Sequence, residues 1–285
     1  MMSYRRHARA IVVLLLSFPA PSPQIELRAP RETILEASVH VPMVVHRGMP
    51  IVEVWIDGDG PFNLAIDTGA MHPVVLDSAL AKRFVKESTG TREEDEVWVD
   101  SIRVGEVVFL GVQAAVRGPL HERLPFDGIL GLPLFLDVLL TLDYPAGRVR
   151  IERAELPEPD GIDILPLETH PTRLAFVELS VEGDTLSALF DTGNLAAPFY
   201  LPRSLAVRVE WASETATPRR AHTAGGQIAL EEVQLAVAIQ LGRFVFDRPL
   251  VVFGDKFSRA IIGGQALSRY AVSIDQKSRR LRLEQ

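Results

Sequence analysis

Two similar stretches of sequence decide the fold of this chain. Residues Val41–Gly69 read VPMVVHRGMPIVEVWIDGDGPFNLAIDTG, and residues Leu165–Gly193 read LPLETHPTRLAFVELSVEGDTLSALFDTG. They align without gaps at an offset of 124 residues, so that Asp67 corresponds to Asp191 (191 − 67 = 124). Because self-similarity at a fixed spacing marks a repeated structural unit, the chain is expected to contain two copies of one fold.

The similarity continues in the same order through the rest of both copies. Its remaining blocks pair PVVLDSALAKR (Pro73–Arg83) with PFYLPRSLAVR (Pro198–Arg208), IRVGEVVF (Ile102–Phe109) with IQLGRFVF (Ile239–Phe246), and ILGLPLFLDVLLTLDYPAGRVRIE (Ile129–Glu152) with IIGGQALSRYAVSIDQKSRRLRLE (Ile261–Glu284). A segment rich in proline and acidic residues, Glu155–Gly161, separates the copies. The expected organisation is a first lobe over residues 33–155 and a second lobe over residues 162–285.

The sequence pattern of each copy predicts mainly β-strands. Alternation at Ile51–Ile56, the turn Asp57–Gly60 and the apolar run Phe62–Ile66 together predict a hairpin. Helical periodicity is confined to short pieces, Ser78–Phe84 and Leu132–Asp137. The expected fold class is all-β with minor helix, built as two tandem lobes related by a pseudo-twofold axis.

Composition excludes several classes of function. A chain of 285 residues with 47% hydrophobic content can bury sizeable cores, whereas a net charge of −7 with scattered basic residues offers nothing to hold nucleic acid. The absence of cysteine removes disulfides, zinc–thiolate sites and thiol nucleophiles. His46 and His170 occupy equivalent repeat positions, but no metal-ligand spacing accompanies them. Neither a metal nor a cofactor is therefore expected.

The first 24 residues have the order of a secretory signal peptide. A basic stretch with Arg5, Arg6 and Arg9 precedes the apolar run Ile11–Phe18, and prolines follow. The apolar run is far shorter than the roughly 20 residues that cross a bilayer, so no integral membrane span is expected after signal removal. Residues 1–24 are predicted to direct export to the periplasm or the medium. The alternative is a retained N-terminus that associates with a membrane.

Each Asp-Thr-Gly triplet follows a hydrophobic strand, which places a carboxylate where a buried strand opens into a turn. Gly69 and Gly193 permit unusual backbone geometry, and Thr68 and Thr192 can hydrogen-bond backbone groups of the facing loop. If the copies pack about a pseudo-twofold axis, the two loops meet on that axis. Two adjacent carboxylates cannot both ionise, so they share a proton. The ionised member can then activate a water while the protonated member donates to a carbonyl oxygen.

These motifs resemble those of the retropepsin-like and pepsin-like aspartic peptidases, most closely the bacterial single-chain kind with two retropepsin-sized lobes. The resemblance covers nearly everything from Val41 to Gln285. It implies that Asp67 and Asp191 are the catalytic pair. It also implies loop support from the residues around them, and bracing by a downstream apolar-apolar-Gly triplet in each lobe. The residues so implied are Thr68, Gly69, Ala70, Thr192, Gly193 and Asn194 for loop support, and Ile129, Leu130, Gly131, Ile261, Ile262 and Gly263 for bracing.

The resemblance further implies a glycine-bearing hairpin flap in each lobe. The candidates are Ser88-Thr89-Gly90 in the first lobe and Thr223-Ala224-Gly225-Gly226 in the second, of which the second is the better match. The first-lobe segment is acidic (Glu93 to Glu96) and lacks a glycine pair, which places its flap contacts in question.

The expected function is that of an aspartic endopeptidase acting on polypeptides as a monomer, with both lobes in one chain. Asn194 departs from the resemblance, because Ser, Thr or Ala is usual at the position after the triplet. Its side chain can hydrogen-bond to Asp191, or it can disturb the pair and silence that lobe. The alternative function is therefore a catalytically silent peptide-binding or sensory module.

Overall fold

The computed structural model describes residues 11–12, 29–84, 96–118, 124–170, 172, 174–223, 226–256 and 258–285. Throughout this part of the chain the structure is almost entirely β, which confirms the expected fold class. The helices are short: α1 (Ser78–Ala81) and the 3-10 helices η1 (Leu132–Phe135), η2 (Arg203–Leu205) and η3 (Gly264–Leu267). The first two are shorter than the sequence predicted.

The first lobe is built on an eight-stranded sheet in the order β2-β9-β7-β10-β6-β5-β4, with β8 paired to both β5 and β9. The predicted hairpin is β5–β6, and its turn residues Asp57 and Gly58 both have positive φ (50° and 86°), as a two-residue type I′ turn requires. The strands are β2 (Glu32–Ile34), β4 (Val44–His46), β5 (Met49–Ile56), β6 (Asp59–Asp67), β7 (Val74–Asp77), β8 (Glu96–Val104), β9 (Val107–Arg117) and β10 (Gly128–Gly131).

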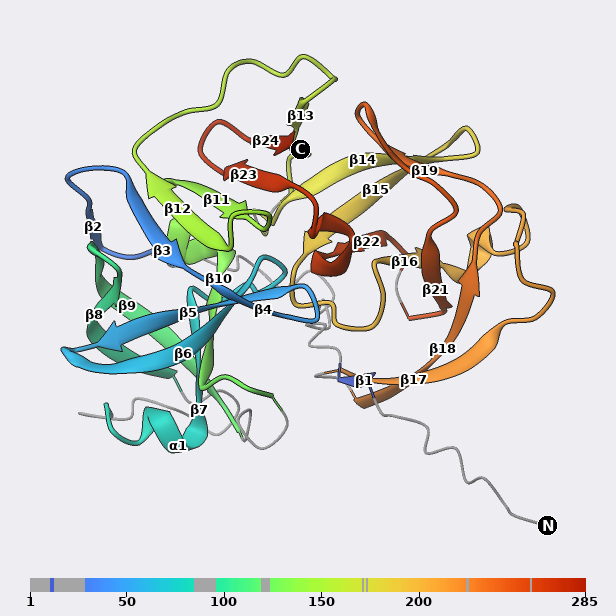
Figure 1. Cartoon of the computed structure of the whole chain (residues 1–285). Helices are drawn as coiled ribbons and strands as arrows, with labels where there is room; N and C mark the ends of the chain where they lie inside the picture. The colour runs from blue at the N-terminus through green and yellow to red at the C-terminus, as the bar shows by residue number, and fades with distance from the viewer. Residues whose placement is uncertain are drawn as a thin grey trace, which may run out of the picture.

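The second lobe repeats this plan in a ten-stranded sheet that also includes β1 from the N-terminal segment, in the order β1-β17-β18-β21-β16-β22-β15-β14-β19-β20. Figure 1 shows the two lobes side by side, the first in blue and green and the second in yellow to red. The strands are β1 (Ile11–Val12), β14 (Phe176–Val181), β15 (Asp184–Asp191), β16 (Phe199–Pro202), β17 (Thr217–Thr223), β18 (Gly226–Gln234), β19 (Ile239–Leu241), β20 (Phe244–Phe246), β21 (Leu250–Gly254) and β22 (Ala260–Gly263).

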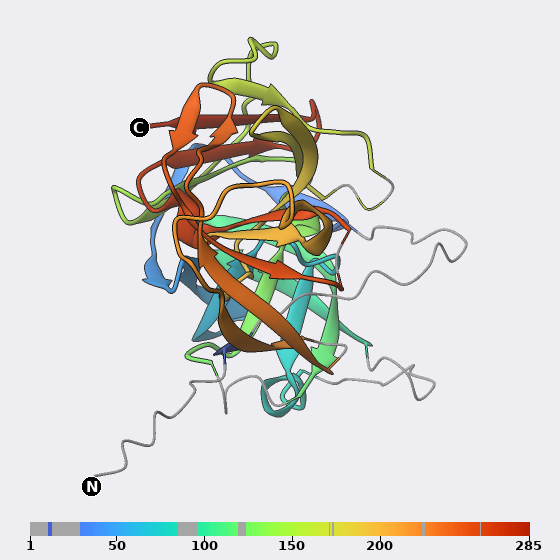
Figure 2. The same cartoon turned by 90° about the vertical axis from the view of Figure 1, so that its right-hand side faces the viewer.

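A six-stranded sheet joins the lobes, in the order β13-β24-β23-β11-β12-β3. Three strands come from each half of the chain; in Figure 1 β11, β12, β23 and β24 lie in the upper part with β3 below β12, and the red C-terminal strands are again in the upper part of Figure 2. The strands are β3 (Val39–Pro42), β11 (Leu139–Asp143), β12 (Arg148–Glu152), β13 (Ile164–Pro166), β23 (Ala271–Asp275) and β24 (Arg280–Glu284).

The pseudo-twofold axis passes between β11 and β23 at the centre of this sheet. Thr141 pairs with Ser273 in the antiparallel register, and their hydroxyl oxygens lie 2.9 Å apart. These two residues are equivalent in the repeat, at the offset that also relates Ile129 to Ile261 (273 − 141 = 261 − 129 = 132). Two equivalent residues that contact each other must lie on the axis that relates their lobes.

The hydrophobic core consists of one large cluster that runs through both lobes and two smaller ones. The smaller clusters lie on the strands that carry Asp67 and Asp191. The first-lobe cluster contains Met49, Ile51, Ala65, Ala70, Val75, Ala115, Leu124, Phe126, Ile129 and Leu195. The second-lobe cluster contains Leu174, Phe176, Leu189, Ala196, Ala197, Tyr200, Ala221, Leu230, Val252 and Ile261, with Met71 and Ile228 packed against it.

No helix among the described residues combines the length and the apolar character that crossing a bilayer demands.

Candidate active site

Asp67 and Asp191 end two equivalent strands, β6 and β15. The last four residues of each strand are buried, so each carboxylate emerges from the interior of its lobe. Both aspartates are only 1% exposed. A buried carboxylate is stable only with hydrogen-bond partners or a proton, so the surroundings of these two side chains decide their chemistry.

A second strand runs parallel to each of these strands and carries the glycine triplet predicted from the sequence. In the first lobe β10 pairs with β6 so that Gly131 lies beside Asp67, and in the second β22 pairs with β15 so that Gly263 lies beside Asp191. Gly131 donates to the carbonyl of Pro73 (2.9 Å), and Gly263 donates to that of Pro198 (2.8 Å). The triplets therefore tie down the chain that follows each aspartate.

Close approach explains why glycine ends each triplet. A Cβ atom on Gly131 would lie 2.0 Å from the carbonyl oxygen of His72, and one on Gly263 would lie 2.8 Å from that of Ala197. Any side chain at these positions would push the aspartate loop away from its strand. The triplet positions are thus set by sterics as well as by hydrogen bonds.

The two threonines hold the two loops together across the axis. The backbone N–H of Thr68 donates to Oγ1 of Thr192 (3.0 Å), and that of Thr192 donates to Oγ1 of Thr68 (3.1 Å). Each hydroxyl in turn donates a hydrogen bond of 2.7 Å to a backbone carbonyl of the opposite lobe, that of Thr68 to Phe190 and that of Thr192 to Ile66. The four bonds form a closed, fully buried network, which fixes the two aspartates relative to each other.

The carboxyl groups of Asp67 and Asp191 lie next to each other and are hydrogen-bonded. The N–H of Gly69 donates to Oδ1 of Asp67, and the N–H of Gly193 donates to Oδ1 of Asp191, both at 2.9 Å. Each glycine also faces the opposite carboxyl, because a Cβ on Gly193 would lie 2.4 Å from Oδ2 of Asp67. The structure thus places the two Asp-Thr-Gly triplets next to each other at the boundary between the lobes.

Burial raises the pKa of both aspartates. For Asp67 desolvation outweighs the hydrogen bonds from Gly69 and Asp191, and the pKa rises from 3.8 to about 6. For Asp191 desolvation, the neighbouring charge of Asp67 and the hydrogen bond between them raise the pKa well above 3.8. The pair therefore holds a shared proton, so that one member can accept a proton while the other donates one.

These shifts predict that the pair destabilises the folded protein as the pH rises. Because both folded-state pKa values lie above the unfolded value, the folded state binds more protons and its free energy of unfolding falls from about pH 4 through pH 6 and beyond. For Asp67 alone the loss is up to about 3 kcal/mol. Asp191→Asn removes the coupled pair, so its melting temperature should exceed that of the wild type at pH 8 and approach it near pH 4. Parallel melting curves across this range would contradict the prediction.

Asn194 supports its loop through its own turn. Its backbone N–H donates to the carbonyl oxygen of Asp191 (3.1 Å), as that of Ala70 does to Asp67 (3.1 Å). Its side-chain Oδ1 accepts from the N–H of Ala196 (3.1 Å), while its Nδ2 is buried with no hydrogen-bond partner among the described residues. The two loops thus make the same turn, and the asparagine side chain caps the second one.

The predicted second-lobe flap coincides with the hairpin β17–β18. Thr223 pairs with Gly226, which begins β18. Ala221 and Leu230 of this hairpin belong to the second-lobe cluster with Leu189, so the hairpin packs over the strands that carry Asp191. The other flap candidates, Thr89, Gly90, Ala224 and Gly225, lie outside the described residues.

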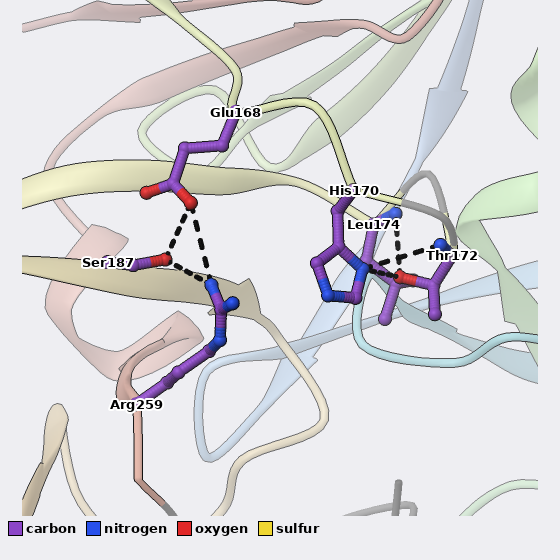
Figure 3. Close-up of polar contacts among 6 residues, drawn as sticks. All are labelled: Glu168, His170, Thr172, Leu174, Ser187 and Arg259. Carbon is purple, nitrogen blue, oxygen red and sulfur yellow. Dashed lines mark hydrogen bonds and ion pairs between the residues drawn. The ribbon is translucent and has the colours of Figure 1, made fainter. Parts of the chain in front are cut away.

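A polar cluster at the edge of the second-lobe cluster accounts for His170 (Figure 3). His170 Nδ1 lies 2.7 Å from Oγ1 of Thr172, and its ring packs 4.5 Å from that of Phe176. Beside it Ser187 accepts from Arg259 (2.6 Å) and donates to Glu168 (2.8 Å). Within the described ranges no group of three or more His, Asp or Glu side chains could hold a metal ion.

Sequence reasoning missed two residues that contact the loop after Asp191. Arg47, in the turn between β4 and β5, and Gln265, in η3, both donate to the carbonyl oxygen of Leu195. Neither belongs to a motif, and each is distant from Leu195 in the sequence. In both cases the equivalent position in the other copy is a proline, and this difference between the copies was the signal that the sequence offered.

Each β lobe brings one buried carboxyl group to a common axis, so the site of this protein is a pair of aspartates. A family model described as aspartyl protease matches residues 52–134 and 177–266, one segment in each lobe and together more than half of the chain. The chain therefore belongs to the aspartyl protease family, as a protein with two retropepsin-like lobes. A search of curated proteins found no match.

Proposed function

We propose that this protein is an aspartic endopeptidase that hydrolyses peptide bonds with a water activated by Asp67 and Asp191. The observation that carries the proposal is the hydrogen-bonded pair of buried carboxyls, whose pKa values are both raised. Membership of the aspartyl protease family supports a polypeptide substrate.

The proposed reaction needs no covalent intermediate. The ionised carboxylate accepts a proton from a water held between the pair, and the resulting hydroxide attacks the scissile carbonyl carbon. The protonated carboxyl donates to the carbonyl oxygen, and the tetrahedral intermediate then collapses with protonation of the departing amine. The N–H groups of Gly69 and Gly193 hold the carboxylate oxygens in place at 2.9 Å throughout.

The proposal predicts cleavage of a peptide library at an acidic to neutral pH, with products identified by mass spectrometry. A statine-type transition-state mimic should block the cleavage, because its hydroxyl takes the place of the attacking water between the carboxyls. The Asp67→Asn variant, purified in the same way as the wild type, is the control for contaminating peptidases. Cleavage that persists in that control, or that a statine leaves untouched, would contradict the proposal.

A second function is favoured by one observation, the buried Nδ2 of Asn194 in the second aspartate loop, which has no hydrogen-bond partner in the part of the chain that the structure describes. Under this alternative the protein binds peptides without hydrolysing them. Selective retention of library peptides with no product across pH 4 to 8 would support it.

A further inference from the structure

Beyond the threonine bonds, the loop that follows Asp191 is tied to the opposite lobe at a further backbone atom. The carbonyl oxygen of Leu195, four residues after Asp191, accepts a hydrogen bond from Nη2 of Arg47 (2.7 Å). The same oxygen accepts a second bond from Nε2 of Gln265 (3.2 Å). Arg47 belongs to the first lobe, so its guanidinium reaches across the boundary between the lobes. A partly buried bond from a charged donor is stronger than one between neutral groups.

The turn that carries Arg47 is itself held firmly. Arg47 and Gly48 have positive φ (54° and 93°), as the tight turn between β4 and β5 requires. A Cβ on Gly48 would lie 2.3 Å from the backbone nitrogen of Gln265, and one on Gly264 would lie 2.0 Å from the carbonyl oxygen of Gly48. The hydroxyl of Tyr144 also donates to that carbonyl (2.9 Å). The turn therefore packs closely against η3, and this packing fixes the backbone position of Arg47.

Each aspartate loop also sends one apolar side chain into the other lobe. Leu195 is buried in the first-lobe cluster, and Met71 packs against the second-lobe cluster. The two residues are equivalent in the repeat (195 − 71 = 124). This exchange anchors both loops in the same way, so it does not distinguish Asp67 from Asp191.

The two hydrogen bonds to the carbonyl of Leu195, here called the polar tether, have no counterpart at the equivalent positions of the other copy. The repeat position equivalent to Arg47 is Pro171 (171 − 47 = 124), and the position equivalent to Gln265 is Pro133 (265 − 133 = 132). A proline has no side-chain donor, so neither can bond the carbonyl of Met71 as Arg47 and Gln265 bond that of Leu195. Both donors of the tether are thus replaced by proline in the other half of the molecule.

We infer that Arg47, assisted by Gln265, is a positioning residue that gives the loop of Asp191 a polar anchor in addition to the threonine bonds and the apolar anchor that both loops have. This inference deepens the proposed function and rests on it. The tether distinguishes the two carboxyls, because it adds a charged hydrogen bond from the first lobe to the threonine bonds that position both aspartates. An open surface pocket of about 350 Å³, lined by Val45, Arg47, Gly48, Gln265 and Ser268, gives room for other side chains at position 47.

Hydrogen–deuterium exchange tests the tether without depending on activity. In Arg47→Met the backbone amides of residues 192–197 should exchange at least about tenfold faster than in the wild type, because local opening is no longer opposed by the charged bond. Those of residues 68–72 should change less than about twofold. Unchanged exchange in both loops, or equal acceleration in both, would overturn the inference.

Kinetics then test whether the tether matters for the reaction. Arg47→Met should lower kcat about tenfold with little change in KM, because a displaced carboxylate affects the transition state more than binding. Arg47→Lys, which keeps a charged donor, should recover part of that loss. The matched control is Thr141→Val, which removes an interlobe hydrogen bond in the six-stranded sheet. It should lower the melting temperature with kcat unchanged.

The outcomes separate the two proposals. If Arg47→Met and Thr141→Val lower kcat in proportion to their loss of stability, Arg47 has only a structural role and the inference fails. If the wild type cleaves no peptide, the proposed function fails, and the exchange experiment alone decides whether the tether exists.

Discussion

Asparagine in place of Asp67 or of Asp191 is expected to abolish peptide cleavage in the folded protein. The proposed chemistry needs one ionised and one protonated carboxyl, and an amide can neither accept nor release the proton at either position. The loss in kcat/KM should be at least about 10³-fold. The fold should persist, because the amide is isosteric and the reciprocal bonds of Thr68 and Thr192 are untouched. Circular dichroism and cleavage of the best library peptide provide the measurements.

Mixing the two variants tests whether the lobes pair within one chain. The threonine network and the six-stranded sheet both join the two halves of the same chain. We therefore expect the mixture of Asp67→Asn and Asp191→Asn to stay inactive and the activity per wild-type molecule to be independent of dilution. Recovery of activity on mixing would mean that lobes pair between chains, and the proposal of an active monomer would fail.

The second large effect is expected from Gly193→Ala. The new Cβ would lie 2.4 Å from Oδ2 and 2.6 Å from Oδ1 of Asp67, distances that no real contact allows. Either the carboxyl of Asp67 moves or the loop retreats and strains the bond between Thr68 and Thr192. Because misplacement of a reacting group by about 1 Å costs on the order of 10²-fold, kcat should fall by at least that factor.

Gly161→Ala is the matched control for this variant. Gly161 lies in the segment between the lobes, and a Cβ there would meet nothing within 4 Å. Its positive φ of 69° makes alanine somewhat strained, so the control carries a modest loss of stability of about 1 kcal/mol without touching the carboxyls. Full activity of Gly193→Ala, or an equal loss in Gly161→Ala, would show that the close approach of Gly193 to Asp67 does not matter.

The repeat made most of the fold and the meeting of the two triplets predictable. Strands and turns follow from local alternation, and two copies that carry the same motif need only one symmetry axis to place Asp67 beside Asp191. Gly131 and Gly263 occupy equivalent repeat positions (263 − 131 = 132), and the resemblance to aspartic peptidases implied their bracing role. Structural features that both lobes share could therefore be predicted from the sequence of either copy.

Features that belong to only one copy, and contacts between copies outside the shared motifs, were not predictable. Nothing local marks β11 and β23 as partners, since their pairing depends on how whole lobes dock. The bonds of Arg47 and Gln265 to Leu195 join residues 148 and 70 positions apart, and no periodicity encodes them. The side chain of Asn194 likewise could have turned toward Asp191, and only the fold decides that it caps its own loop.

The six-stranded sheet also sets an order of events during synthesis. Strand β11 emerges from the ribosome well over a hundred residues before β23, its partner across the axis. Until then the nascent first half carries an open strand edge whose unpaired N–H and C=O groups can join another chain. Strand β23 closes that edge when it is translated, so a messenger truncated after the first half would yield a product prone to self-association.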